Sequence, residues 1–226
     1  LGNQTIDARP LDDSSGSEPF DLPGFWRTKF AVNTPAKPNV PAYNYHDWAE
    51  ARGHRRAGPA VIAHSLHVSV CVLPSQASVE AKSRTQASIA AQWRVADCVF
   101  SSVQEPGLAG VGGDIGWTLY VCAGDELAPF ALYEIERALS EGSAAAFVSF
   151  DHDERGADGR LCNPAFKPDA NPDLLLSSCY VNRAFAVRNA WAAHREAINA
   201  PRSPLALAYR LALSALREQG SGGLLH

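Results

Sequence analysis

The sequence contains no methionine, no Cys-x-x-Cys pair and no apolar run of the length that crosses a membrane. A membrane-spanning helix needs about 20 consecutive apolar residues, so no transmembrane segment is expected in this chain. The five cysteines are an odd number without metal-site spacing, so we expect reduced, buried thiols and no zinc. Because the chain starts at Leu1 and lacks methionine, we expect a piece of a longer polypeptide.

Positive charge is also scarce. The chain has 20 Lys and Arg against 24 Asp and Glu, a net charge of -4, and no basic stripe, which argues against a nucleic-acid partner. Apolar residues make up 46% and charged residues 19%, so most elements are expected to be buried on more than one side. A length of 226 residues fits one domain with a sizeable core.

The N-terminal region differs in composition from the remainder. Residues 1–60 are rich in Pro, Ser, Asp and Asn without sustained periodicity, which predicts an irregular arm or linker. A short helix is expected at residues 45–52, with Tyr45 and Trp48 on one face because positions three apart are neighbours. Residues 61–226 are expected to form the folded domain.

Apolar strand-like runs alternate with helical patterns from Leu66 onwards, which predicts a mainly parallel α/β sheet flanked by helices. Ligands bind beyond the carboxyl ends of the strands in such sheets. The expected strands cover residues 66–73, 95–100, 117–122, 145–150 and 180–187, and the expected helices cover residues 78–93, 129–139 and 204–218. The residues that fall at these strand ends are Pro74, Ser75, Ser101, Ser102, Asp125, Glu126, Asp151 and Asp153.

Turn chemistry adds two local expectations. Asp158-Gly159 is typical of a hairpin turn. Asn171-Pro172-Asp173 before three leucines predicts a helix start, with Asn171 as the cap and Asp173 close to the positive end of the helix dipole.

The most specific pattern is polar and lies between two apolar runs. Residues 166–177 read Phe-Lys-Pro-Asp-Ala-Asn-Pro-Asp-Leu-Leu-Leu-Ser and follow the acidic turn Asp151-His-Asp153. A second block, residues 124–133, contains Asp-Glu-Leu-Ala-Pro and then Ala-Leu-Tyr. Both resemble signatures of the family 2 inverting glycosyltransferases of bacterial surface polysaccharide synthesis, and Tyr45-x-x-Trp48 resembles a third, weaker one. The resemblance covers roughly Tyr45 to the C-terminus.

This resemblance implies a GT-A-like fold that transfers a sugar from a nucleotide-diphosphate donor to a saccharide or lipid-linked acceptor at the cytoplasmic face. It implies a divalent metal, Mn²⁺ or Mg²⁺, at Asp125 and Glu126 to neutralise the leaving diphosphate. Asp151 and Asp153 are then the catalytic pair, which lies near the acceptor or makes a second metal contact. The nucleotide-sugar-binding residues that it implies are Pro74, Ser75, Ser101, Ser102, Asp125 and Lys167.

Lys167 is the one cation inside the longer signature block. As a hypothesis it anchors the loop by pairing with Asp151, Asp153 or Asp169. The alternative is an ordinary solvated surface lysine, because exposed ion pairs contribute little.

Several positions depart from the family pattern. Ser101-Ser102 replaces an expected Asp, Cys122 and Gly124 replace two acids of the metal block, and an uncertain alignment puts Ala208 and Arg210 where the base is expected. The segment between Ser102 and Trp117 is shorter than in the family, and the chain stops at His226, before a further family block.

These losses leave a second hypothesis open. It is a catalytically inactive glycosyltransferase-fold domain that serves as a binding or assembly module, with other domains of a longer polypeptide as its partners. A dinucleotide-binding oxidoreductase is disfavoured, since no Gly-x-Gly-x-x-Gly follows the first strand.

Overall fold

The computed structural model describes residues 45–55, 66–101, 112–140, 144–192 and 203–226. The chain divides into two units, Leu1–Ala42 and Tyr43–His226, and the described residues belong to the second. The expected short helix is present as α2, Tyr45–Arg55. The rest of the predicted arm lies outside the described residues, so the domain boundary near residue 60 stays a prediction.

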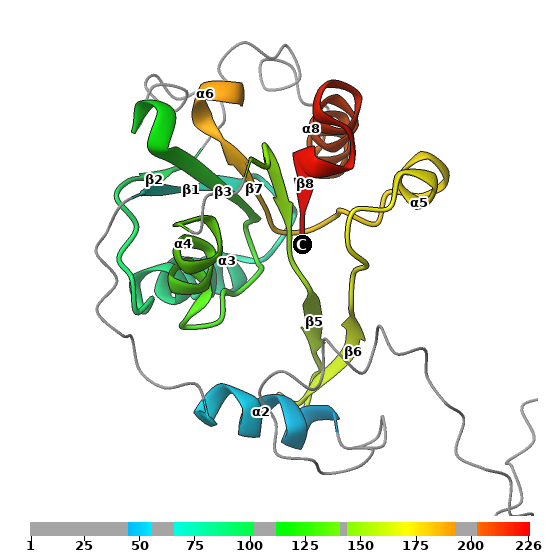
Figure 1. The fold of residues 1–226 in the computed structure, drawn as a ribbon. Helices are drawn as coiled ribbons and strands as arrows, with labels where there is room; N and C mark the ends of the chain where they lie inside the picture. Colours follow the sequence, from blue (N-terminus) through cyan, green and yellow to red (C-terminus); the bar gives the residue numbers. More distant parts are fainter. Residues whose placement is uncertain (1–44, 56–65, 102–111, 141–143, 193–202) are drawn as a thin grey trace, which may run out of the picture. The chain divides into compact units, whose positions relative to one another are not determined.

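A six-stranded sheet forms the centre of the second unit (Figure 1). Its order is β2-β1-β3-β7-β4-β8, and β7 is antiparallel to both neighbours while every other pair is parallel. All strands except β7 therefore run in one direction, and the predicted α/β class is confirmed. The strands are β1 His67–Leu73, β2 Val99–Phe100, β3 Gly116–Cys122, β4 Phe147–Ser149, β7 Phe185–Arg188 and β8 Leu224–Leu225.

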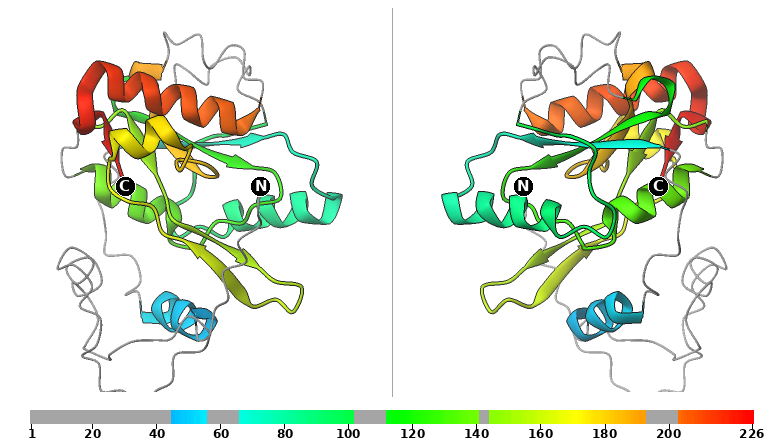
Figure 2. Two further views of the ribbon diagram at one scale, coloured as in Figure 1. Left: turned by 90° about the vertical axis from the view of Figure 1, so that its right-hand side faces the viewer. Right: turned by 90° about the vertical axis from the view of Figure 1, so that its left-hand side faces the viewer.

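Helices cover both faces of the sheet, as the side views show (Figure 2). On one face lie α3, Val79–Ala90, and α4, Ala131–Ser140; on the other lie α8, Pro204–Gln219, and the short α5, Pro172–Ser177. A further short helix, α6 (Asn189–Ala192), follows β7. None of the described helices is long and apolar enough to cross a membrane.

The helix starts follow local sequence rules. Ser78 caps α3, and its hydroxyl accepts a hydrogen bond from the Ala81 backbone N–H. Asn171 caps α5 in the same way, with Pro172 in the first turn, so the predicted start of this helix is confirmed.

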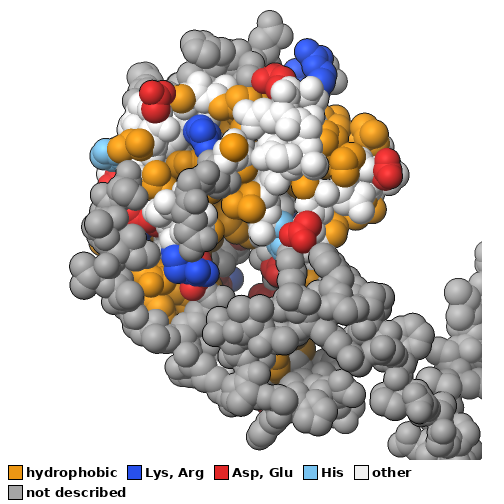
Figure 3. Space-filling view, in the orientation of Figure 1, with side chains coloured by type: hydrophobic (Ala, Val, Ile, Leu, Met, Phe, Trp, Pro, Cys, Tyr) orange, Lys and Arg blue, Asp and Glu red, His pale blue; other side chains and the backbone are white. Residues whose placement is uncertain are grey.

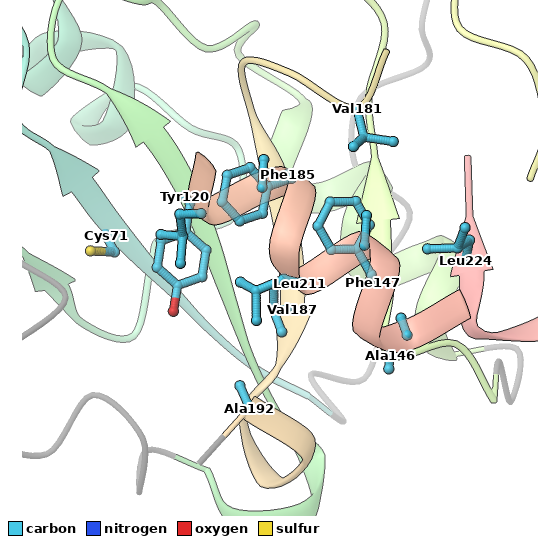
Figure 4. Close-up of a cluster of buried hydrophobic side chains, with 14 of the residues drawn as sticks. Cys71, Tyr120, Ala146, Phe147, Val181, Phe185, Val187, Ala192, Leu211 and Leu224 are labelled. Atoms are coloured by element: carbon cyan, nitrogen blue, oxygen red, sulfur yellow. The ribbon is translucent and has the colours of Figure 1, made fainter. Parts of the chain in front are cut away.

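The alternation of side chains along the strands builds one apolar core on each face. Beneath α8, Phe185 stacks between Tyr120 and Phe147, with ring centroids 4.9 and 5.4 Å apart (Figure 4). Beneath α3 and α4, Val70 and Leu119 pack in a second cluster. Burial on both faces explains why these strands read as nearly continuous apolar runs.

A two-stranded hairpin follows β4 in the chain. Its strands are β5, His152–Arg155, and β6, Leu161–Ala165, and Gly159 adopts a φ of 79° in the turn between them. The hairpin predicted from Asp158-Gly159 is therefore confirmed. Helix α2 contacts the end of the hairpin, because the rings of Tyr45 and Trp48 both meet Phe166 edge-on. This arrangement confirms that Tyr45 and Trp48 share a face.

Three strand predictions are too long, and one of them, residues 145–150, forms a strand only at Phe147–Ser149. The run at residues 95–100 becomes a strand only at Val99–Phe100, since the Arg94 guanidinium takes the Val95 carbonyl, although Cys98 still accepts a hydrogen bond from Val70. The run at residues 180–187 becomes Phe185–Arg188, because Arg183 has a φ of 66° that a strand cannot contain.

The cysteine prediction is correct in part. All five cysteines are free thiols, but only Cys71 is fully buried and Cys98 is exposed. Cys98 lies in the loop before β2, so its apolar neighbourhood in the sequence does not become a buried one.

Candidate functional site

The carboxyl ends of β1, β3 and β4 lie at one edge of the sheet, because these strands run in the same direction. Ser75 follows β1, Asp125 follows β3 and Asp151 follows β4. The prediction that Asp125 and Asp151 share an edge is therefore confirmed. Acidic side chains and a histidine also gather where the ribbon marks the C-terminus (Figure 3), in agreement with the contact of His226 with Asp151.

Ser75 joins the ends of β1 and β3. Its hydroxyl donates a hydrogen bond to the Ala123 carbonyl and accepts one, at 3.1 Å, from the Ala77 N–H. The hydroxyl is thus used inside the protein, and Pro74 beside it is exposed. Ser101 is exposed after β2, whereas Ser102 lies outside the described residues.

The backbone conformation at Gly124 explains why a glycine replaces one of the acids of the metal block. Its φ is 106°, and a Cβ added there would lie 2.7 Å from the Cβ of Ala77, closer than two carbons approach in proteins. Its N–H donates to the Thr85 hydroxyl at 2.8 Å, which holds the turn against α3. A residue with a side chain does not fit this turn, so an acid at position 124 is incompatible with the backbone seen here.

Asp125 is only partly neutralised. Its Oδ1 lies 3.4 Å from the Arg183 guanidinium, and its Oδ2 is buried with no hydrogen-bond partner among the described residues. Burial raises the pKa of Asp125 above its ordinary value, although the nearby charges of Arg183 and His152 oppose the shift.

Glu126 is paired differently. Its Oε1 lies 2.9 Å from the Arg84 guanidinium and its Oε2 lies 3.9 Å from that of Arg155. Within the described ranges, no group of three or more His, Cys, Asp and Glu side chains could hold a metal ion. Of the two residues predicted to hold the metal, Asp125 keeps one oxygen, Oδ2, without a hydrogen-bond partner among the described residues. A single protein ligand fits an ion that keeps most of its contacts to water and to a bound diphosphate, as Mg²⁺ often does.

Asp151 is bound from two sides. Its Oδ1 accepts a hydrogen bond from the backbone N–H of Lys167 at 2.7 Å and lies 3.0 Å from His226 Nε2. Burial alone raises the pKa of Asp151, but hydrogen bonds from His226 and Lys167 and their charges outweigh burial, so the pKa lies below its ordinary value. Asp153 has a different partner, the Tyr45 hydroxyl on α2, which donates to Asp153 Oδ2 at 2.8 Å. The two carboxylates of the acidic turn therefore do not share partners.

Lys167 is buried, with 6% of its surface exposed, so it is not a solvated surface lysine. Its ammonium donates to the Asn182 carbonyl at 2.6 Å, while its link to Asp151 is made by its backbone N–H. Burial lowers the pKa of Lys167 to about 8, although the charge of Asp151 opposes the shift. The residue does anchor the loop, through a peptide oxygen instead of the carboxylate pairing that we hypothesised.

Arg183 and His152 belong to this edge but were not predicted. The His152 Nδ1 and Asn182 Oδ1 atoms are buried and, like Asp125 Oδ2, have no hydrogen-bond partner among the described residues. Burial lowers the pKa of His152, with further lowering by Lys167 and Arg183, so its ring is neutral near pH 7. Nothing in the local sequence distinguishes Arg183, because a lone arginine after Val181-Asn182 matches no motif.

The predicted base region contains no acid. Ala208 is fully buried on α8, packed in the core beneath that helix, and Arg210 is exposed. This part of α8 is a packing element, so a proton acceptor, if the protein has one, lies elsewhere.

Taken together, the fold and this edge define an α/β protein with a charged, incompletely hydrogen-bonded cluster beyond the carboxyl ends of its strands. The O-antigen biosynthesis protein RfbC of Myxococcus xanthus is similar to part of it, with 38% identity over 82 residues. The match covers 36% of this chain and 6% of that protein, so the chain spans a small fraction of its relative's length. No protein-family model matches the chain, and no solved structure matches it.

Proposed function

We propose that this protein is an inverting GT-A-type glycosyltransferase that transfers a sugar from a nucleotide-diphosphate donor to a saccharide or lipid-linked acceptor. The observation that carries the proposal is the cluster at the carboxyl edge, where Asp125, Asp151, Lys167 and Arg183 converge beside buried polar atoms that have no partner among the described residues. Unpaired buried polar groups in native proteins call for an explanation, and a polar ligand supplies one. The part-length similarity to an O-antigen biosynthesis protein supports a role in surface polysaccharide synthesis.

The donor would bind at the ends of β1 and β3. A divalent ion, Mn²⁺ or Mg²⁺, would be carried by the diphosphate and meet the protein at Asp125, with Glu126 in the next position of the same turn. Such an ion would supply Lewis-acid stabilisation of the leaving diphosphate. Pro74, Ser75, Ser101 and Ser102 would line the nucleotide side, with Ser75 acting mainly by fixing the two strand ends.

The acceptor would bind beside the acidic turn. During transfer the acceptor hydroxyl loses its proton as its oxygen bonds to the sugar carbon and the bond from that carbon to the diphosphate breaks. Asp151 and Asp153 are the proposed contacts for this hydroxyl, but each already accepts a hydrogen bond within the protein. His152 lies between them in the sequence, is neutral near pH 7 and has a ring nitrogen without a partner among the described residues, so it is a third candidate to take the proton.

The second candidate function is a domain that binds a nucleotide sugar or assembles with other domains without catalysing transfer. Two observations favour it: Glu126 is held between two arginines, and Ala208 is buried where an acid was expected. We propose the enzyme first because both signature blocks, residues 124–133 and 166–177, are present. The buried polar atoms that lack a partner among the described residues also count against a domain that only assembles. Because nucleotide-activated sugars are found at the cytoplasmic face, we propose that face as the location of the transferase.

A titration of the purified protein tests the proposal. UDP-, GDP- and dTDP-sugars are titrated calorimetrically with Mn²⁺ and with EDTA, and released nucleotide is measured with and without saccharide acceptors. We expect one donor class to bind, and transfer to be slow because loss of a positioned base lowers rates about 100- to 10,000-fold. Binding without release would favour the inactive module that binds a nucleotide sugar, and no binding of any donor would contradict the enzyme and leave only the assembly module.

Single substitutions Asp151→Asn, Asp153→Asn and His152→Gln then identify the proton acceptor. We expect substitution of the residue that takes the proton to abolish transfer while binding of the nucleotide-sugar donor is retained. Robust transfer that survives all three would move the base away from the acidic turn.

A further inference from the structure

The turn before β7 has a backbone conformation that its sequence does not favour. Arg183 has a φ of 66°, in the left-handed region that residues with a side chain seldom occupy. Such conformations persist where the surrounding structure enforces them, and they gather at ligand-binding sites. The contacts of this turn therefore need an explanation.

Lys167 provides the enforcing contact. Its buried ammonium donates a hydrogen bond of 2.6 Å to the Asn182 carbonyl, the peptide group that immediately precedes Arg183. The backbone N–H of the same lysine is held by Asp151, which itself contacts His226. A continuous set of contacts thus runs from β8 and the end of β4 to the peptide on which Arg183 turns.

The guanidinium of Arg183 is only partly used. Its side chain is 51% exposed, and its NH1 makes a long contact of 3.4 Å with Asp125 Oδ1. A guanidinium has five N–H donors in a planar fork that matches phosphate oxygens. This cation is therefore held at the edge of the sheet with donors to spare.

Buried oxygen and nitrogen atoms that lack a partner among the described residues lie near this guanidinium. Asp125 Oδ2 and Asn182 Oδ1 are buried acceptors without a partner in the described part of the chain, and His152 Nδ1 is a buried ring nitrogen in the same state. A ligand that combines anionic oxygens for Arg183 with hydroxyl groups for the two acceptors would satisfy all of them. A nucleoside diphosphate carries phosphate oxygens and ribose hydroxyls in one molecule.

We propose that Arg183, oriented by Lys167, binds the diphosphate of the nucleotide donor directly, so that a metal ion is not the sole cation that neutralises it. The inference rests on the proposed function and deepens it, because it assigns a ligand-binding residue that lies outside both signature blocks. Lys167 is a positioning residue in this arrangement and does not itself contact the nucleotide.

Calorimetric titration of UDP, GDP and dTDP in EDTA tests the role of Arg183. We expect binding of at least one diphosphate to persist in EDTA and to weaken about 10-fold or more in Arg183→Gln, with partial recovery in Arg183→Lys. Arg155→Gln is the matched control, since Arg155 is also half-exposed, at 53%, beside a carboxylate. We expect that control to bind within about 2-fold of the unmodified protein, since it loses an exposed pair and an exposed hydrogen bond to the Gly159 carbonyl.

The corresponding nucleoside monophosphate sharpens the test. Removal of the β-phosphate should weaken binding to the unmodified protein by a larger factor than binding to Arg183→Gln, because the substitution has already removed the group that contacts it. Arg183→Gly should bind as weakly as Arg183→Gln and yet raise the melting temperature, because glycine adopts a φ of 66° without strain.

A double-mutant cycle tests the role of Lys167. Lys167→Met should weaken diphosphate binding in the unmodified protein but not in the Arg183→Gln background, since residues that act through one another are not additive. A purely structural lysine would instead weaken both equally, which would overturn its positioning role.

The outcomes separate this inference from the proposed function. Diphosphate binding to the unmodified protein that Arg183→Gln retains in full would overturn the inference and leave the proposed function standing. Binding that disappears completely in EDTA would also overturn it, because the metal would then be the sole cation. Absence of binding under every condition would overturn the proposed function and this inference with it.

Discussion

The two ends of the same sheet use their charged residues in opposite ways. At the amino end, the Arg94 side chain is 4% exposed and donates hydrogen bonds to Glu136, Asp97 and two backbone carbonyls. Asp97 also accepts a hydrogen bond of 2.6 Å from the backbone N–H of Val68, the second residue of β1. The network ties β1 and the segment before β2 to α4, so it connects three parts of the fold.

At the carboxyl end, the charged side chains have weaker or fewer hydrogen bonds among the described residues. Arg183 is half-exposed, its contact with Asp125 is 3.4 Å long, and three buried polar atoms nearby lack partners among the described residues. The amino-end network is built as a structural joint, and the carboxyl-end cluster is built with unused hydrogen-bonding capacity. The comparison indicates that folding alone accounts for the first group of charges and not for the second.

The largest effect is expected from breaking the amino-end network. Arg94→Ala leaves the Glu136 carboxylate, whose side chain is 1% exposed, buried beside the gap left by its partner. Removing one member of a buried ion pair costs about 3–5 kcal/mol of the free energy of unfolding. Urea denaturation of the two proteins measures the difference, and a loss below about 1 kcal/mol would mean that the network resembles an ordinary surface pair.

The next effect is a pH dependence from Lys167. Its pKa is about 8 in the folded protein against 10.5 as the ordinary value, so between these pH values the unfolded chain binds a proton that the folded protein lacks. The contribution of Lys167 to the free energy of unfolding therefore rises with pH from about 8 to about 10.5, at up to roughly 1.4 kcal/mol per pH unit. Denaturation of the unmodified protein and of Lys167→Met across this window should reveal the slope as their difference.

Lys82→Met is the control for that measurement, because Lys82 is exposed on α3. The same slope in the differences for both variants would show that burial of Lys167 is not its source.

A moderate effect, opposite in sign for stability and for binding, is expected at Asp125. Metal-dependent diphosphate binding should weaken about 10-fold or more in Asp125→Asn, equivalent to ~1.4 kcal/mol. Burial raises the pKa of Asp125, so its ionised form is disfavoured in the folded protein at neutral pH. The neutral amide should therefore leave the free energy of unfolding unchanged or raise it.

Parallel calorimetry with Mn²⁺ and urea denaturation check both expectations for Asp125. A clear loss of stability together with unchanged diphosphate binding would show that Asp125, like the residues of the amino-end network, has a structural role.

The smallest effect is expected for the exposed pair at the carboxyl edge. Arg84 is 58% exposed and Glu126 is 33% exposed, so Arg84→Gln should change the free energy of unfolding by less than about 1 kcal/mol. The same denaturation assay gives the value, and added salt should reduce it further. A larger loss of the free energy of unfolding would show that Glu126, like the amino-end network, is part of a structural ion pair.

The sequence predicts the fold better than it predicts the site. Alternating apolar runs locate the strands, and capping residues such as Ser78 and Asn171 locate helix starts, because these signals act within a few residues. The ends of the runs are less well predicted, as at residues 95–98, where the Arg94 side chain takes over backbone hydrogen bonding. Contacts with distant side chains decide such boundaries.

For the site, the sequence identifies Asp125, Asp151 and Lys167 as polar residues near strand ends, and the structure brings them to one edge. It does not identify Arg183 or His152, which match no motif and become candidates only through their neighbours. The metal at Asp125 and Glu126 stays a prediction, although the two arginines around Glu126 could not be anticipated from the sequence.

By itself, the sequence determined the α/β class, the hairpin at Asp158-Gly159 and the edge of the sheet at which polar residues gather, since periodicity and turn chemistry are local properties. Only the tertiary structure decided which charged side chains are enclosed by partners within the fold and which can still bind a ligand. Arg94 and Arg183 are the same residue type in one chain, but the first is enclosed by acceptors from distant segments and the second projects from a strained turn. Burial and partner number create that difference, and both depend on contacts across the fold.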